Sequence, residues 1–305
     1  MRAVVFGAGG FIGRKTVKLL AKNGFDLSLF DMQFTEEQID MYRCVKGDFS
    51  NPGDVEAVFQ DRIDTAVHLI STTVPVTADK YPVADVRGNL INTLEMLDLF
   101  VKKNVRRVIF VSSGGTVYGP LDREAREQDA CCPICSYGIV KRSIEGYLAL
   151  YKRIEGLDYT ILRVSNTYGA GQTGERQQGI IGKFLHRIAG GEQVELCGDG
   201  SIVRDFIHVD DVAGAIAAVM EYEGPQHVFN VGTGIGHSVR QVLEMIESII
   251  DKPVTVLHRP GNSLDILSNV LDISKIRSEI GWRPEIDLEA GITKTYHEIR
   301  SSLVG

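Results

Sequence analysis

The stretch Arg2-Ala3-Val4-Val5-Phe6-Gly7-Ala8-Gly9-Gly10-Phe11-Ile12-Gly13 decides the fold of this chain. Its first five residues form a short apolar run that suits a buried parallel strand, and residues 14–23 after it have a helical pattern. In this order of strand, turn and helix, glycines permit a tight turn and let a pyrophosphate approach the helix N-terminus. We therefore predict a dinucleotide-binding loop with glycines at three-residue spacing, at Gly7, Gly10 and Gly13.

A carboxylate after the next predicted strand indicates which dinucleotide binds. Residues 27–30 form a second apolar run, and Asp31 follows it directly. A carboxylate at this place accepts hydrogen bonds from the adenosine ribose hydroxyls and repels a 2′-phosphate, so NAD is predicted in preference to NADP. Arg14 and Lys15 would favour NADP, but they suit solvated positions of a helix at least as well.

A tyrosine and a lysine four residues apart, Tyr137 and Lys141, indicate acid-base chemistry. On a helix this spacing puts both side chains on one face, so we expect the ammonium to lower the pKa of the phenol from its usual value near ~10. The pair alone often only decorates a helix. Here it follows an apolar run, residues 107–111, that ends in Ser112 and Ser113, and sites in open α/β sheets lie at strand ends.

At these residues the chain resembles the extended short-chain dehydrogenase/reductase family, and within it the NAD-dependent nucleotide-sugar epimerases and dehydratases of the UDP-galactose 4-epimerase type. The resemblance covers essentially the whole chain. Beyond the glycine loop and the Tyr137/Lys141 pair, it includes Gly47-Asp48-Phe49, His68-Leu69-Ile70-Ser71, Asn89, the run 112–119, the run 163–169 and the run 198–211.

The resemblance implies a set of site residues. The implied cofactor contacts are Gly7, Gly10, Phe11, Ile12, Gly13, Asp31, Asp48, Phe49, Leu69, Ile70, Ser71, Asn89, Ser112, Tyr137 and Lys141. The implied substrate contacts are Thr116, Asn166, Arg204, Arg259, Asp265 and Asn269, and the implied catalytic residues are Tyr137, Lys141 and Ser113. No cluster of metal ligands is expected, because the histidines are scattered.

The chain departs from the family pattern at the catalytic hydroxyl and at the nucleotide. Many relatives carry Ser or Thr where this chain has Gly114; Ser113 is favoured as the replacement and Thr116 stays open. A Gly114→Ser change is therefore expected to leave activity equal or higher. The usual diphosphate-binding arginine is replaced by Asn262, and Arg259 is the candidate substitute. Cys197 stands where many relatives have an aromatic residue near the base.

The expected fold is α/β, a Rossmann-type doubly wound parallel sheet with a smaller interleaved α/β substrate lobe. The 305 residues, 44% of them hydrophobic, can bury a large core. Residues 1–164 plus 205–234 are expected to form the NAD-binding domain, and residues 165–204 plus 235–305 the nucleotide-sugar-binding lobe. The substrate site is expected in the cleft between the two.

Composition limits the partners. A net charge of -7 without a basic stripe argues against nucleic acid. No apolar run reaches the ~18 residues that span a membrane, and Met1 leads straight into the first strand, so a cytoplasmic protein without membrane contact is expected. Five cysteines suit a reducing compartment, and a non-redox interpretation of Cys132 and Cys135 is favoured because no thioredoxin-like pattern surrounds them.

Two predicted helices, near residues 89–104 and 137–155, carry apolar side chains on more than one face. One face packs on the sheet, and the remainder suits a partner. In the family these helices pair across a dimer, so the resemblance implies a homodimer; cover within the monomer is the alternative.

The resemblance implies 4-epimerisation of a UDP-glucose/UDP-galactose type substrate through a transient 4-keto sugar. A 4,6-dehydratase would need an acid pair where this chain has Gly115 and Thr116. An NADH-dependent nucleotide-4-keto-sugar reductase stays open, and a non-catalytic NAD-binding regulator is less favoured because Tyr137 and Lys141 are both present. Asn269 stands where relatives restricted to glucose and galactose substrates have a bulky Tyr, which suggests room for N-acetylated sugars. A role in satisfying only a nearby backbone group is equally favoured.

Overall fold

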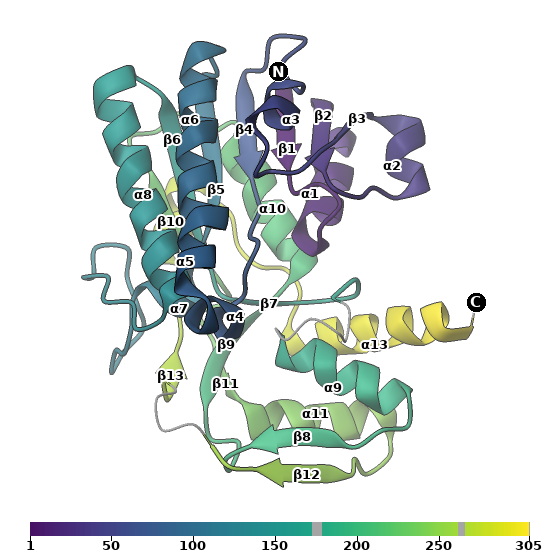
Figure 1. The fold of residues 1–305 in the computed structure, drawn as a ribbon. Coiled ribbons are helices and arrows are strands. Elements are labelled where there is room, and N and C mark those ends of the chain that lie inside the picture. The colour runs from purple at the N-terminus through teal and green to yellow at the C-terminus, as the bar shows by residue number, and fades with distance from the viewer. Residues whose placement is uncertain (173–178, 262–265, 305) are drawn as a thin grey trace.

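A seven-stranded parallel sheet forms the centre of the molecule, in the order β3-β2-β1-β4-β5-β6-β10 (Figure 1). The computed structural model describes residues 1–172, 179–261 and 266–304. The strands of this sheet are β1 (Arg2–Phe6), β2 (Asp26–Asp31), β3 (Arg43–Lys46), β4 (Thr65–His68), β5 (Arg107–Ser113), β6 (Asp158–Val164) and β10 (Val228–Val231). The order reverses direction between β1 and β4, as in a doubly wound sheet, so the predicted Rossmann-type fold is confirmed.

Alternation along β1 explains why the sheet is covered on both faces. Val4 and Phe6 pack into one apolar core with Phe100 and Ile144, whereas the intervening side chains join a second core on the opposite face. Successive side chains of a strand point to opposite faces, and all of these are buried, so β1 must lie in the middle of a three-layer structure.

Helices form the outer two layers. Figure 1 shows α6 and α8 side by side over one face, while α1 and α10 pack together and share the core of the other face. The helices are α1 (Phe11–Lys22), α2 (Glu36–Met41), α3 (Pro52–Glu56), α4 (Pro75–Lys80), α5 (Pro82–Asp85), the π-helix η1 (Val86–Ile91), α6 (Asn92–Lys102), α7 (Gly114–Val117), α8 (Ser136–Glu155), α10 (Val209–Met220) and α12 (Ser274–Ile280).

A second lobe lies below the carboxyl ends of the strands in Figure 1. It contains a four-stranded sheet and a two-stranded sheet around a third apolar core. The strands are β7 (Asn166–Tyr168), β8 (Val194–Cys197), β9 (Val203–His208), β11 (Gly236–Ser238), β12 (Val256–Arg259) and β13 (Ser268–Asn269), and the helices are α9 (Ile180–Ala189), α11 (Val239–Ile250) and α13 (Leu288–Val304).

Two elements fall on the other side of the expected lobe boundaries. Strand β9, which we expected in the sheet region, pairs with β7, β11 and β13 in the four-stranded sheet. Helix α12, expected in the substrate lobe, contacts β10, and its Ile276 joins the core of the central sheet. Each element packs its apolar face against whichever core the folded chain brings it to, so the chain crosses between the lobes more often than the sequence pattern indicates. The exact division into domains stays a prediction.

No helix in the described part of the chain is long and apolar enough to cross a membrane.

Candidate active site

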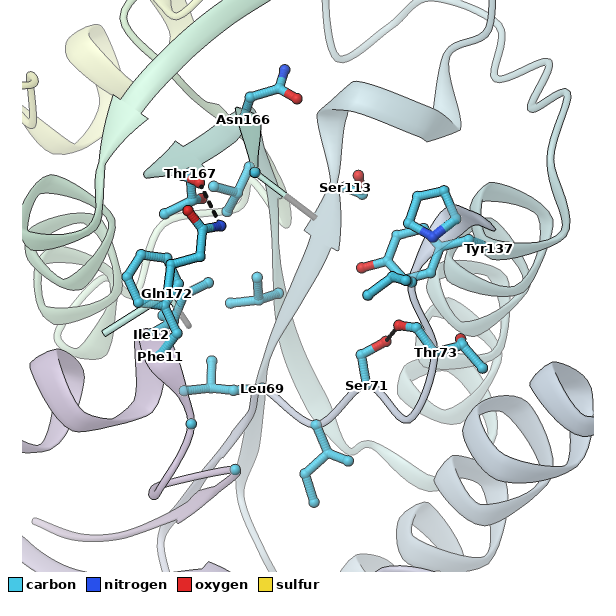
Figure 2. Close-up of a pocket in the computed structure, with 18 of the residues that line it drawn as sticks. Phe11, Ile12, Leu69, Ser71, Thr73, Ser113, Tyr137, Asn166, Thr167 and Gln172 are labelled. Atoms are coloured by element: carbon cyan, nitrogen blue, oxygen red, sulfur yellow. Dashed lines mark hydrogen bonds between the residues drawn. The ribbon is translucent and has the colours of Figure 1, made fainter. Parts of the chain in front are cut away.

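A cavity of about 1050 Å³ runs from the glycine loop to the second lobe. It exceeds the usual ~300–1,000 Å³ of small-molecule pockets, so it has room for more than one ligand. Figure 2 shows Phe11 and Ile12 at the start of α1 on one side, with Ser71, Thr73, Ser113 and Tyr137 on the other. The site lies at the carboxyl ends of the parallel strands, where a doubly wound sheet is expected to bind its ligands.

The glycine loop has the geometry that a dinucleotide needs. Gly7 has a φ of 88°, which favours glycine, and a Cβ on Gly13 would lie 2.0 Å from the carbonyl oxygen of Gly7. Helix α1 begins after Gly10, which offers no side-chain cap, so the first amides of α1 are open to the cavity. A phosphate satisfies such amides and benefits from the helix dipole, so these residues fit the pyrophosphate of NAD.

Asp31 lies at the end of β2 and lines the same cavity. Its Oδ2 accepts a hydrogen bond from the amide of Gly9 at 2.9 Å, and its Oδ1 accepts one from the amide of Met32 at 2.7 Å. Oδ1 also accepts a hydrogen bond from the amide of Gln33 at 3.4 Å. A carboxylate oxygen has two lone pairs, so Oδ2 retains acceptor capacity for a ribose hydroxyl. Asp31 therefore also holds the glycine loop, a role that the sequence pattern does not reveal.

The other predicted cofactor contacts divide into lining and supporting residues. Asp48, Phe49, Leu69, Ile70, Ser71 and Ser112 all line the cavity. Hydrogen bonds from the amide and the hydroxyl of Ser50 lower the pKa of Asp48. Asn89 is buried on η1 outside the cavity lining, and its Oδ1 accepts the amide hydrogen of Thr72 at 2.8 Å. It shapes the loop after β4 rather than the cavity wall.

Tyr137 and Lys141 share one face of α8, as predicted, but their electrostatics differ from the prediction. Burial raises the pKa of Tyr137 to about 12, and burial lowers the pKa of Lys141 to about 8. The Lys141 ammonium donates to the carbonyl oxygen of Val111 at 3.0 Å and lies 5.6 Å from the centre of the Tyr137 ring. The expected lowering of the phenol pKa by Lys141 is therefore wrong for this structure, because the ammonium is directed to β5 and desolvation dominates.

Two residues that carry hydroxyls line the cavity, one at the end of β5 and one in α7. Ser113 lines the cavity on the same side as Tyr137 (Figure 2), and Thr116 lines it from α7. The Thr116 Oγ1 atom is buried and has no hydrogen-bond partner in the described protein. Gly114 lies outside the cavity lining, and a Cβ there would come within 2.6 Å of Leu271 Cδ1. A side chain at this position would point into the core and not toward a ligand.

A buried polar chain supports this run from α8. The Ser112 hydroxyl donates to Glu145 at 2.6 Å, and Glu145 forms an ion pair with Arg163 at 2.7 Å. Arg163 in turn donates to the Tyr118 hydroxyl at 3.0 Å. The side chains of Glu145 and Arg163 are almost fully buried, so a mutation that removes either one would leave the other as an uncompensated buried charge.

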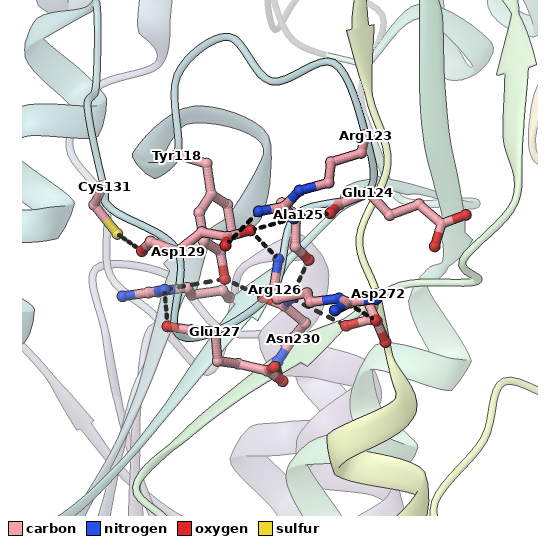
Figure 3. Close-up of polar contacts among 11 residues, drawn as sticks. Tyr118, Arg123, Glu124, Ala125, Arg126, Glu127, Asp129, Cys131, Asn230 and Asp272 are labelled. Carbon is pink, nitrogen blue, oxygen red and sulfur yellow. Dashed lines mark hydrogen bonds and ion pairs between the residues drawn. The ribbon is translucent and has the colours of Figure 1, made fainter.

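Figure 3 shows how this series of buried polar contacts continues from Tyr118 to the loop before α8 and to the segment after β13. The Tyr118 hydroxyl donates to Asn230 Oδ1 at 2.6 Å, and Asn230 Nδ2 donates to the carbonyl oxygens of Ala125 at 2.8 Å and Asp272 at 3.1 Å. Arg126 contacts the Asp272 carboxylate at 3.0 Å. These contacts hold residues 112–119, the run that includes Ser113 and Thr116, against segments that are far apart in the sequence.

The predicted substrate residues are only partly brought together. Asn166 and Arg204 line the cavity, and Arg204 donates to the carbonyl oxygens of Val203 and Ile266. Arg259 lies on β12 outside the lining and forms a 3.0 Å ion pair with Glu195, so it is not placed as a cavity arginine. Asp265, like Asn262, lies outside the described residues.

Asn269 is buried on β13 and is not a lining residue. Its Nδ2 donates to the carbonyl oxygen of Gly114 at 3.3 Å, while its Oδ1 has no partner in the described part of the chain. The first contact is the local backbone role that we considered as the alternative.

Several lining residues were missed by the sequence reasoning. They are Thr73, Val74 and Pro75 after β4, Gln172, and Gly179 to Ile181 at the start of α9. The polar residues after β4 were the available signal, since they follow a strand of the central sheet; nothing in the sequence indicates that the start of α9 lines the same cavity as α1. No group of three metal-ligating side chains gathers within residues 1–172, 179–261 and 266–304.

Comparison with known proteins agrees with this geometry. The model of the NAD dependent epimerase/dehydratase family matches residues 3–232, and the chain belongs to that family. The cofactor of this family is NAD, as predicted.

Particular relatives carry two different activities. A UDP-glucose 4-epimerase from Thermotoga maritima, solved with UDP-glucose, is 32% identical with a TM-score of 0.94 and 99% and 100% of the two chains covered. The enzyme from Thermus thermophilus, solved with NAD, is 29% identical with a TM-score of 0.92, covering 99% and 100%. A dTDP-4-dehydro-6-deoxyglucose reductase from Escherichia coli is 30% identical over 97% of each chain.

Proposed function

We propose that this protein interconverts the C4 epimers of a nucleotide-diphosphate sugar, of the UDP-glucose/UDP-galactose type, through a transient 4-keto sugar. The observation that carries the proposal is one continuous cavity that holds the open N-terminus of α1, the Tyr137/Lys141 pair and the unpartnered Thr116 hydroxyl. When bound, NAD supplies the hydride acceptor at the sugar carbon, and its positive ring favours the phenolate form of Tyr137.

Tyr137 is the proposed acid-base group. The pKa of about 12 keeps the Tyr137 phenol protonated at neutral pH even though the Lys141 ammonium lies 5.6 Å from the centre of its ring. Tyr137 therefore becomes a base only in the loaded site. The Ser71 hydroxyl hydrogen-bonds to the Tyr137 oxygen and lowers the pKa of that phenol, which favours the ionised form. Tyr137 then removes the C4-hydroxyl proton of the sugar and returns it after the keto group has turned over.

Thr116 is the better candidate for the hydroxyl that contacts the reacting oxygen. A buried hydroxyl without a partner costs free energy, and a rotation of the Thr116 side chain toward the cavity would let a ligand supply the missing bond. Ser113 also lines the cavity, but its hydroxyl is not both buried and without a partner. This order reverses the preference for Ser113 that the sequence suggested, and the comparison of Thr116→Val with Ser113→Ala tests it.

The second lobe offers a place for the substrate diphosphate. Helix α9 begins at Ile180 beside Gly179, which provides no side-chain cap, and both residues line the cavity together with Asn166 and Arg204. Open helix amides and an arginine are suitable donors to phosphate oxygens. A UDP-sugar is the favoured substrate because the similar Thermotoga maritima enzyme was solved with UDP-glucose.

The main alternative is an NADH-dependent reductase of nucleotide-4-keto sugars. It is favoured by the similarity to the Escherichia coli reductase and would use the same tyrosine and lysine. Purified protein is incubated with UDP-, dTDP- and GDP-hexoses without added cofactor, and products are separated by chromatography. Formation of a 4-epimer pair from bound NAD supports the epimerase; product only from a 4-keto sugar, with equivalent loss of NADH, supports the reductase.

Substrate size is tested at Asn269. If this residue borders the sugar C2 substituent, the protein accepts N-acetylhexosamine nucleotides, and Asn269→Tyr lowers kcat/KM for them more than for the plain hexoses. Asn269→Asp is the matched control, because it keeps the size of the side chain. An unchanged ratio between the two substrate types would leave only the bond to the Gly114 carbonyl as its role.

A homodimer through α8 and the helices near 89–104 is part of the proposal. Ile139, Tyr147, Leu150 and Ile154 are all between 38% and 56% exposed and recur at helical spacing along α8. Leu150→Glu is expected to give monomers in light scattering after gel filtration. The equally drastic Ile235→Glu, on a separate exposed site, serves as control; a wild-type monomer would refute this arrangement.

A further inference from the structure

Asp85, the last residue of α5, is fully buried and lies outside the cavity lining. Its Oδ1 accepts hydrogen bonds from Thr73 Oγ1 at 2.6 Å and from Asn89 Nδ2 at 2.9 Å. Its Oδ2 accepts one from Ser136 Oγ at 2.7 Å. All three donors are side chains, and they come from three different segments of the chain. The acid-base chemistry described above makes no use of this carboxylate.

The segments that meet at Asp85 are the two that hold the Tyr137 phenol. Ser136 is the first residue of α8 and directly precedes Tyr137. Thr73 belongs to the loop after β4, and Ser71 of this loop donates to the carbonyl oxygen of Thr73 at 3.0 Å. The Ser71 side chain also lowers the pKa of the Tyr137 phenol through a hydrogen bond. One buried carboxylate therefore links the backbone that carries the phenol to the loop that carries Ser71.

The surroundings of Asp85 strengthen this link. Asn89 bonds to Thr73 Oγ1 at 3.0 Å and to the amide of Thr72 at 2.8 Å, so the loop is held at two successive residues. A Cβ on Gly88 would lie 2.6 Å from Thr72 Oγ1, which shows how closely η1 approaches the loop. η1 is a π-helix, and such turns occur frequently at functional sites.

The charge of Asp85 also reaches the acid-base pair. It raises the pKa of Lys141, against the larger effect of burial, and it raises the pKa of Tyr137. Glu145 acts on Lys141 in the same direction, but its charge is paired with Arg163. Asp85 forms no ion pair with any described residue of the chain. The remaining titratable groups around the pair are Cys135, beside Tyr137, and His68, beside Lys141, with Asp79 bonded to the Ser136 amide.

We propose that Asp85 is a positioning residue of the active site, which fixes Tyr137 against the loop that carries Ser71 and supplies the negative charge that acts on Tyr137 and Lys141. The proposal rests on the acid-base role of Tyr137 in the proposed function. It predicts two separable effects, one of geometry and one of charge.

Asp85→Asn separates the charge from the geometry. The amide oxygen can keep the bonds from Thr73 and Asn89, and the amide nitrogen can donate to Ser136 Oγ, because a serine hydroxyl also accepts. The acid limb of the pH profile of kcat/KM is expected to move to lower pH by roughly 0.5–1 unit, since removal of a nearby like charge makes the phenol easier to ionise. Asp79→Asn is the control, as it removes an exposed charge that bonds to the same serine.

Thr73→Val and Ser136→Ala test the geometry while the charge remains. Each is expected to lower kcat by about tenfold with little change in KM for the sugar nucleotide, and without a shift of the pH profile. These variants also cover the case in which Asp85→Asn fails to fold. Wild-type kcat in both, together with an unshifted profile in Asp85→Asn, would overturn the proposal.

A readout without turnover keeps this test distinct from that of the proposed function. The ionisation of Lys141 is followed by NMR of ¹³C-labelled lysine in the whole protein, with its signal assigned from Lys141→Met. Its titration midpoint, near the pKa of about 8, is expected to fall in Asp85→Asn and to stay in place in Asp79→Asn. If the wild type has no epimerase or reductase activity but this shift occurs, the proposed function fails and the charge effect stands. An unchanged midpoint overturns the charge effect.

Discussion

A side chain at Gly114 is expected to destabilise the protein, although the sequence pattern suggests that a serine there would restore a catalytic hydroxyl. The structure directs the Gly114 Cβ at the fully buried Leu271, with 2.6 Å to Cδ1 and 3.0 Å to Cδ2, and leaves 3.1 Å to the carbonyl oxygen of Arg163. Gly115, the next residue of α7, is the matched control. A Cβ there meets only Ser113 Oγ at 3.8 Å and Asn166 Nδ2 at 3.9 Å.

The magnitude follows from these contacts. Both glycines lie in α7, so the backbone entropy effect of a Gly→Ala change, roughly 0.4–1 kcal/mol, is common to both variants. Gly114→Ala adds overpacking against Leu271, which typically costs about 1–3 kcal/mol. Gly115→Ala adds only ordinary contacts. The free energy of unfolding of Gly114→Ala is therefore expected to lie about 1–3 kcal/mol below that of Gly115→Ala.

Urea unfolding measures this difference through the fluorescence of Trp282, which is the single tryptophan of the sequence and is buried. Leu271→Val removes one methylene from the crowded contact, so Gly114→Ala combined with Leu271→Val is expected to be more stable than the two separate losses predict. The activity of Gly114→Ser should not exceed that of the wild type. Equal stability of the Gly114 and Gly115 variants, or a clear gain of activity in Gly114→Ser, would refute the reasoning.

Three further predictions concern the acid-base residue, the cofactor and pH. Tyr137→Phe is expected to lower turnover by roughly 10²-fold while NAD binding measured by calorimetry persists; near-normal turnover would exclude Tyr137 as the base. The protein should bind NAD more tightly than NADP, and Asp31→Asn, which retains an oxygen for the Gly9 amide, should narrow the gap; tighter binding of NADP by the wild type would contradict this. Burial lowers the pKa of His68 to about 3 and that of His208 to about 4, below the ordinary 6.5, so the unfolded chain takes up protons that the native state refuses. The urea midpoint should accordingly be nearly constant between pH ~6.5 and the pKa of Lys141 at about 8, and fall below pH ~6.5 toward pH 4, less steeply in His208→Asn; a midpoint that rises on acidification below pH ~6.5 would contradict the assignment.

Local pattern was sufficient for the class of fold and for the cofactor end of the site. The apolar run of β1, the glycines after it and Asp31 lie within one strand-turn-helix unit and the next strand, so short-range spacing already constrains their geometry. The Tyr137/Lys141 spacing likewise predicted a shared helical face. What the spacing could not predict was the direction of the pKa of Tyr137, because desolvation depends on everything that packs around α8.

The sequence by itself determined the doubly wound sheet, the glycine turn before α1 and the shared helical face of Tyr137 and Lys141. Only the tertiary structure decided that Gly114 faces Leu271, that the Thr116 hydroxyl has no partner among the described residues, and that Arg259 pairs with Glu195 and is not itself a lining residue. The physical reason is the range of the forces involved. Propensity and periodicity act over a few residues, whereas burial, close packing and charge act between atoms that the chain brings together from distant segments.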